Sequence, residues 1–137
     1  MKNLFFLVVF IVYGFGSSHN FIEKYNYEVD YKSGLEKAKK ANKPILLVLS
    51  TKTCPWCRKF ERQTLKKEVI DNIIKANFIP IALDKNSGIY PKKFTPKVVP
   101  TVYFIDPKDQ SIIFTSYGYK NKNNFKKILL DITKDSK

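Results

Sequence analysis

The chain has 137 residues, enough for one domain with its own hydrophobic core, and no repeat or low-complexity tract points to a second unit. Its formal net charge is +13, but all except Arg58 and Arg62 of its 25 basic residues are lysines, and these are scattered along the chain. Because sites that clamp phosphate or read guanine favour arginine, we expect no nucleic-acid partner, while attraction to acidic proteins or anionic lipid head groups stays open.

Residues 1–18 have the pattern of a secretory signal. A lysine near the start precedes an uncharged run from Leu4 to Tyr13, and small residues follow it. The run is shorter than the roughly 20 apolar residues that cross a bilayer. We therefore predict export to a periplasm, with cleavage after Gly16 or Ser18 and a domain over residues 19–137. An uncleaved signal would tether this domain to the membrane.

The first elements expected in the domain are a helix and a buried strand. Ser33 and Glu36 have the spacing of a capping box, which predicts a helix that starts at Ser33 and ends before Pro44. An unbroken apolar run, Ile45 to Leu49, is too short for a buried helix. It predicts a central strand that is covered on both faces.

A second helix and strand are expected after the cysteines. Apolar residues recur at helical spacing from Phe60 to Asn77, with a kink predicted near Lys66. The next apolar stretch, Phe78 to Leu83, predicts a strand. Pro80 within it favours a position at a sheet edge, because proline cannot donate a ladder hydrogen bond.

The last part of the chain predicts a strand pair and a final helix. A looser stretch, 84–96, is punctuated by glycine and proline. Two apolar runs, 101–105 and 112–116, flank the turn-rich segment 106–109 and predict an antiparallel pair. From Phe125 to Ile132 the apolar residues recur at amphipathic helical spacing. The alternating order of helices and strands predicts an α/β fold.

The chemistry is concentrated in the segment Cys54-Pro55-Trp56-Cys57. Cys54 follows a polar bend and precedes Pro55, a residue favoured at the first helical position, so Cys54 should be the helix N-cap. There its sulfur faces free backbone N–H groups and the positive end of the helix dipole, which should lower its pKa from roughly 8.5 into the range of about 3.5 to 7. Cys57 lies one turn deeper. We therefore expect Cys54 to attack and Cys57 to resolve the mixed disulfide.

Other interpretations of the cysteines are weaker. A structural zinc site needs about four ligands, and the chain offers two cysteines and only His19, so we predict no metal unless two chains share one. Two inert buried cysteines would not need a proline-started helix. Trp56 should be exposed beside Cys54, where it offers a partner an apolar contact. Arg58 and Lys59 either raise the positive potential near Cys54 or form a solvated helix face.

The chain from Ser33 to Ile132 resembles the thioredoxin superfamily, and in particular small exported thioredoxin-like proteins of bacterial periplasms. Lys43-Pro44, Cys54-Pro55-Trp56-Cys57 and Val99-Pro100-Thr101 carry the resemblance. It implies a thioredoxin-like fold, with a central mixed sheet and helices on both faces.

The resemblance also implies roles for Val99 and Pro100. The peptide bond between them would be cis, Pro100 would lie against the dithiol, and Val99 would offer backbone hydrogen bonds to a bound polypeptide. Two departures matter. No histidine stands between the cysteines, and Val48 occupies the place of a buried acid found in thioredoxins. The proton of Cys57 must then leave through water or another group.

We accordingly expect an exported thiol-disulfide oxidoreductase with catalytic Cys54 and Cys57 and substrate-binding Trp56, Val99 and Pro100. Its partners would be protein thiols and disulfides and a membrane electron donor. We expect a monomeric reductase in the periplasm without a cofactor. The alternative is a non-catalytic thioredoxin-like protein that binds polypeptides or a soft metal ion through the same cysteines.

Overall fold

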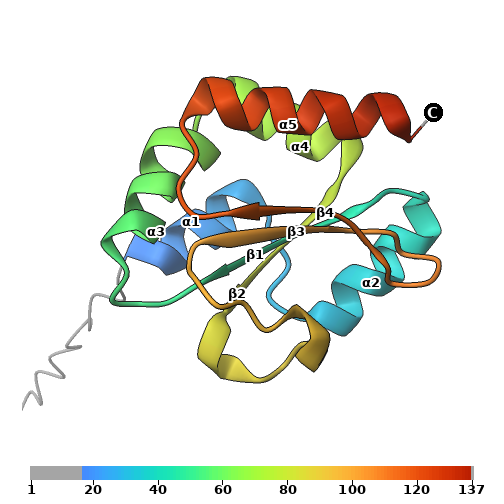
Figure 1. The fold of residues 1–137 in the computed structure, drawn as a ribbon, viewed down its shortest axis with the longest axis horizontal. Coiled ribbons are helices and arrows are strands. Elements are labelled where there is room, and N and C mark those ends of the chain that lie inside the picture. The colour runs from blue at the N-terminus through green and yellow to red at the C-terminus, as the bar shows by residue number, and fades with distance from the viewer. Residues whose placement is uncertain (1–16, 137) are drawn as a thin grey trace, which may run out of the picture.

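The computed structural model describes residues 17–136 (Figure 1). Its elements are, in chain order, α1 (Ser17–Tyr25), α2 (Tyr31–Ala41), β1 (Ile45–Ser50), α3 (Pro55–Phe60), a π-helical turn (Glu61–Leu65), α4 (Glu68–Asn77), β2 (Ile79–Asp84), 3₁₀ turns at Lys85–Ser87 and Lys92–Phe94, β3 (Thr101–Ile105), β4 (Ile112–Tyr117) and α5 (Lys122–Asp135). From α2 onward this is the predicted order of main helices and strands.

The four strands form one mixed sheet. Their order is β2-β1-β3-β4, with β1 parallel to β2 and antiparallel to β3, and β3 antiparallel to β4. The apolar run Ile45 to Leu49 therefore lies in an inner strand, and it is buried along its whole length. The predicted α/β fold with a central mixed sheet is confirmed.

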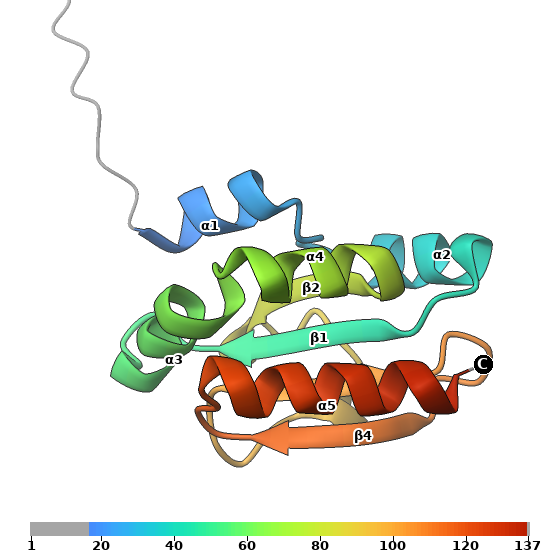
Figure 2. The same cartoon turned by 90° about the horizontal axis from the view of Figure 1, so that it is seen from above.

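Helices cover both faces of this sheet, and alternate side chains of β1 enter a separate core on each face. Leu46 and Val48 belong to one core, and Ile45, Leu47 and Leu49 belong to the other. In Figure 1 α4 and α5 lie above the sheet and α2 lies below it. Figure 2 shows α4 between α1 and α5.

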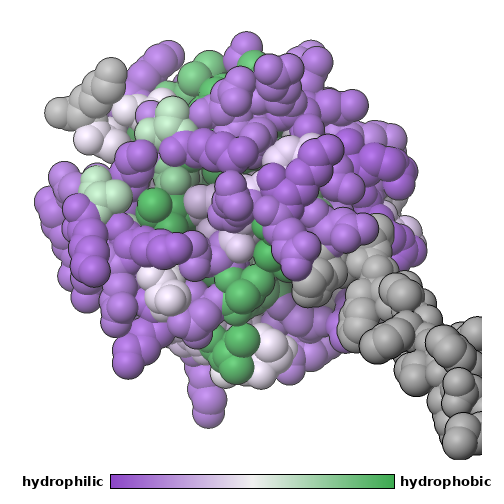
Figure 3. All heavy atoms as spheres, turned by 180° about the vertical axis from the view of Figure 1, so that it is seen from behind, coloured by the Kyte–Doolittle hydropathy of each residue, from purple (hydrophilic) through white to green (hydrophobic). Residues whose placement is uncertain are grey.

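Hydrophilic side chains cover most of the face in Figure 3, and hydrophobic ones gather in a narrow band, as expected for a solvated lysine-rich surface.

The start of α2 differs from the prediction. Asp30, not Ser33, is the N-cap, and its carboxylate accepts a hydrogen bond from the Ser33 N–H at 2.8 Å. The predicted capping box is therefore wrong, because Ser33 already lies inside the first turn. The helix ends as predicted before Pro44, since Asn42 adopts the left-handed conformation with φ of 51°.

The predicted kink near Lys66 is confirmed. After α3 the chain widens into the π-helical turn Glu61–Leu65, in which the Lys66 N–H donates to the Glu61 carbonyl at 2.9 Å. A new helix then starts at Glu68. The buried Thr64 fixes this turn, because its hydroxyl donates to the Lys120 carbonyl at 2.7 Å.

β2 is an outer strand of the sheet, in agreement with the position expected from Pro80. Glu28 covers its free side: the Glu28 N–H donates to the Pro80 carbonyl, and the Ala82 N–H donates to the Glu28 carbonyl, both at 2.9 Å.

The sequence patterns did not predict α1. Its Phe21 is buried and packs against the Tyr27 ring at 4.8 Å between centroids, which ties the helix to the core. The helix begins at Ser17, so it spans the last predicted cleavage position, whereas the hydrophobic part of the predicted signal lies outside the described residues. Within residues 17–136, no helix combines the length and the apolar character that crossing a membrane requires.

Candidate dithiol active site

The first cysteine lies where the central strand meets a helix. β1 ends at Ser50, a short bend follows, and Cys54 is the N-cap of α3 with Pro55 at the first helical position. The Cys57 N–H donates to the Cys54 sulfur at 3.0 Å. The predicted N-cap is therefore confirmed, and the Cys54 sulfur faces a backbone donor at the positive end of the helix.

The two cysteines form a disulfide in this structure. Their Cα atoms are 5.2 Å apart, within the usual range of about 4.4 to 6.8 Å for a disulfide. Cys54 is partly exposed, whereas Cys57 is only 7% exposed. This difference fits the predicted order of attack, because a partner's sulfur reaches Cys54 more readily than Cys57.

The segment before β3 closes the other side of the dithiol. The Val99–Pro100 peptide bond is cis, as the resemblance implied, and the Val99 carbonyl oxygen lies 3.8 Å from the Cys54 sulfur. The Pro100 carbonyl accepts a hydrogen bond from the Gly118 N–H at 2.7 Å. Gly118 has a φ of 71°, which favours glycine, so the loop after β4 holds the cis proline in place.

Trp56 stands on the surface beside Cys54, as predicted, with 56% of its area exposed. Its ring centroid is 5.8 Å from that of Tyr119, and the Lys59 ammonium lies 5.0 Å from the Trp56 ring and 4.9 Å from the Tyr119 ring. Lys59 therefore braces two aromatic rings through cation–π contacts. Arg58 donates to the Lys52 carbonyl at 3.0 Å and so steadies the bend that leads to the dithiol.

Comparison with known proteins agrees with this fold. A family model for the thioredoxin-like domain matches residues 31–133. The chain belongs to the thioredoxin-like family. The match covers nearly the same part of the chain as the resemblance expected from the cysteine and proline motifs.

Curated relatives of this thioredoxin-like protein share only part of their length with it. Spermatogenesis-associated protein 20 of Rattus norvegicus is 32% identical over 68 residues, which are 50% of this chain and 8% of the relative. Anterior gradient protein 3 of Mus musculus is 29% identical over 79 residues, which are 56% of this chain and 47% of the relative. The chain thus spans less than half the length of each of these relatives.

Solved structures share the fold at low identity. A thioredoxin from Thermus thermophilus has a TM-score of 0.67 and 17% identity, and the match covers 77% of this chain and 85% of that one. A protein titled DsbH oxidoreductase has a TM-score of 0.66 and 17% identity over 78% and 83% of the two chains. The C-terminal domain of Neisseria meningitidis DsbD has a TM-score of 0.61 and 18% identity over 77% and 97%. Identities this low show the fold alone.

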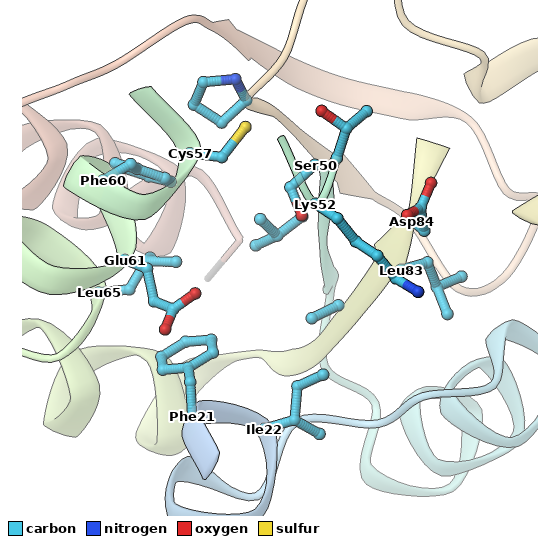
Figure 4. Close-up of a pocket in the computed structure, with 14 residues that line it drawn as sticks. Phe21, Ile22, Ser50, Lys52, Cys57, Phe60, Glu61, Leu65, Leu83 and Asp84 are labelled. Carbon is cyan, nitrogen blue, oxygen red and sulfur yellow. The ribbon is translucent and has the colours of Figure 1, made fainter. Parts of the chain in front are cut away.

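A cavity of about 210 Å³ opens beside Cys57 in this thioredoxin-like protein (Figure 4). Cys57 and Glu61 form one wall, Phe21 and Ile22 of α1 form another, and Val48 contributes from β1. Val48, which occupies the place of the buried acid of thioredoxins, is apolar and only 5% exposed.

Glu61 is a titratable residue of this site that the sequence patterns did not single out. Its carboxyl is half-buried, and burial raises its pKa, while the Lys66 ammonium 3.4 Å away partly offsets this effect. The available signal was its spacing: Glu61 follows Cys57 by four residues and therefore lies on the same helix face. Among the residues that the structure describes, no cluster of histidine, cysteine, aspartate or glutamate has the arrangement of a metal site.

Proposed function

We propose that this protein is an exported thiol-disulfide oxidoreductase that exchanges disulfides with protein partners. The observation that carries the proposal is the Cys54–Cys57 disulfide at a helix N-terminus, with the more exposed sulfur facing the Val99 carbonyl beside a cis proline. A structural disulfide would not need its outer sulfur at a surface bordered by an exposed aromatic ring. Trp56 supplies that ring and would bind an apolar part of the partner.

The reaction uses the two sulfurs in sequence. In the reduced protein the Cys54 thiolate attacks a partner disulfide, forms a Cys54–partner bond and expels the partner's other sulfur as thiolate. Cys57 then loses its proton and attacks the Cys54 sulfur. This step forms the Cys54–Cys57 disulfide and releases the second partner sulfur. Two electrons pass from the protein to the partner, and the protein ends in the oxidised form described here.

We base the proposed reducing direction on the groups that would stabilise the Cys54 thiolate. These are the Cys57 N–H, 3.0 Å from the Cys54 sulfur, and the helix end, and no imidazole stands between the cysteines. Strong oxidants of this kind gain their potential from a highly stabilised thiolate. With fewer stabilisers, the protein would work as a reductase, which needs an electron donor to reduce it again.

Export rests on the pattern of residues 1–18 alone, which is typical of a secretory signal. The proposed location is the periplasm, where a membrane protein would supply the electrons. A chain that keeps its signal would carry out the same exchange from the membrane surface.

Insulin reduction with a small thiol as donor tests the proposed activity. The wild-type protein should turn over, and a Cys57→Ser variant should instead accumulate mixed disulfides on Cys54, because the resolving sulfur is missing. A Cys54→Ser variant is the matched control and should form no mixed disulfide. If the wild-type protein shows no exchange between about pH 6 and 9, where cysteine thiolates form, the alternative of a non-catalytic binder of polypeptides or soft metal ions replaces this proposal.

A further inference from the structure

The proposed reaction has an unmet requirement at Cys57. Its thiol must lose a proton before it attacks the Cys54 sulfur, yet Cys57 is only 7% exposed, and burial in apolar surroundings raises the pKa of a thiol. Val48, the neighbouring β1 residue on the cavity wall, carries no titratable group. Efficient resolution near neutral pH therefore needs a proton acceptor from another element.

Glu61 has the position that this role requires. Its backbone N–H donates to the Cys57 carbonyl, so Glu61 lies one helical turn beyond Cys57. Side chains four residues apart on a helix have Cβ atoms about 5 to 6 Å apart and point to the same side. Both residues line the same cavity, and Figure 4 shows the Glu61 carboxylate directed into it. The cavity of about 210 Å³ has room for several water molecules that would link the two groups.

Burial and nearby charges set the pKa of the Glu61 carboxyl. Burial raises its pKa, and Lys66 lowers it again from 3.4 Å. Lys52 and Asp84 line the cavity on its far side. The Tyr27 hydroxyl is buried near the Glu61 charge, and the pKa of that phenol is strongly raised, so it stays protonated. A carboxyl whose pKa lies above its ordinary value is better matched to accept a proton near neutral pH.

We propose that Glu61 accepts the Cys57 proton through cavity water and returns it when the disulfide is reduced. This inference rests on the proposed oxidoreductase function. When the mixed disulfide is resolved, the Cys57 S–H bond breaks, and the proton reaches the Glu61 carboxylate. The Cys57 electron pair forms the bond to Cys54, and the partner leaves as thiolate. Glu61 then releases its proton to solvent. In the reverse reaction the Glu61 carboxylic acid protonates the departing Cys57 thiolate.

The test separates the two chemical steps. Reduced protein is mixed in a stopped-flow instrument with an equimolar aromatic disulfide dye, dithiobis(nitrobenzoate), which releases one coloured thiolate when Cys54 attacks and a second when Cys57 resolves. Both phases are followed from about pH 5.5 to 9. In Glu61→Gln the second phase should slow at least about tenfold below pH 7.5, with recovery toward pH 9 as hydroxide replaces the acceptor. Its first phase should stay within about twofold of the wild type.

Two further variants sharpen the result. Lys66→Gln removes the cation that lowers the Glu61 pKa, so its second-phase profile should shift to higher pH. The exposed Glu68, which begins α4, provides the matched control, and Glu68→Gln should leave both phases unchanged. The Lys66→Gln profile tests the proposal without changing Glu61 and keeps it falsifiable if Glu61→Gln does not fold.

The outcomes distinguish this inference from the function on which it rests. A wild-type protein that releases no second thiolate contradicts the oxidoreductase proposal itself. A Glu61→Gln variant with wild-type second-phase rates contradicts only the role of Glu61. Two other results also overturn that role. Equal slowing of both phases would point to a general structural effect, because a proton acceptor for Cys57 acts only in the resolving step. A Lys66→Gln profile that does not move would show that the resolving step does not depend on the charge near Glu61.

Discussion

Phe60 anchors the helix that carries the dithiol, and its replacement by alanine tests this directly. Its side chain is 1% exposed and meets the Phe125 ring edge to face, with centroids 5.1 Å apart. Truncating a fully buried phenylalanine costs about 3 to 5 kcal/mol, and an aromatic pair of this kind contributes about 0.5 to 1.5 kcal/mol of that cost. We expect Phe60→Ala to lower the free energy of unfolding by about 4 kcal/mol.

Urea unfolding of the oxidised protein, followed by far-ultraviolet circular dichroism, measures this loss. For a slope of about 1.5 kcal/mol per molar urea, 4 kcal/mol corresponds to a midpoint lower by roughly 2.7 M. Phe114→Ala is the matched control, because Phe114 lies on β4 with 44% of its area exposed, and it should cost less than about 1.5 kcal/mol. If the two substitutions cost the same, α3 is not held by Phe60, and the packing argument is wrong.

Three further outcomes are expected. Gly34→Ala should lower the free energy of unfolding by about 1 to 3 kcal/mol in urea titrations, because an added Cβ would collide with the Ile81 side chain where α2 packs on β2; no loss would show that the contact relaxes freely. Trp56→Ala should lower kcat/KM for insulin about 5- to 30-fold, corresponding to about 1 to 2 kcal/mol, and leave the first phase with the small dye unchanged; equal losses with both substrates would contradict a partner contact. The pKa of Glu61 is higher in the folded protein than the unfolded value of about 4.5. Ionisation of Glu61 therefore lowers the free energy of unfolding as the pH rises from the unfolded pKa through the folded pKa, and this loss is absent at lower pH. Glu61→Gln should therefore melt at a higher temperature than the wild type at neutral pH but not at pH 4, and a gain that is independent of pH would contradict this.

The dithiol and the central strand could be predicted because their signals are local. A proline directly after Cys54 sets the start of α3, and five consecutive apolar residues from Ile45 to Leu49 leave no polar face for solvent. The cis bond before Pro100 needed the family resemblance as well, since only about 5% of the bonds that precede proline in folded proteins are cis.

Other features depend on choices that the sequence patterns do not resolve. Asp30 and Ser33 are both good helix caps, and only the path of the chain from Glu28, which pairs with β2, decides that Asp30 takes the position. The helix α1 is short, and its burial depends on the Tyr27 ring against which Phe21 packs. The cavity beside Cys57 is lined by residues from several separate elements. The sequence patterns therefore could not predict that Glu61 and Cys57 line the same cavity.

The pKa of Cys54 in the reduced protein tests the central claim most directly. Ultraviolet absorbance of the thiolate, followed against pH in the wild type and in Cys57→Ser to assign the signal, gives this value. The Cys57 N–H and the helix end should hold it at or below about 7, compared with roughly 8.5 for free cysteine. A Cys54 pKa at or above that of free cysteine would show that the helix end does not activate the sulfur, and it would contradict the proposed reaction.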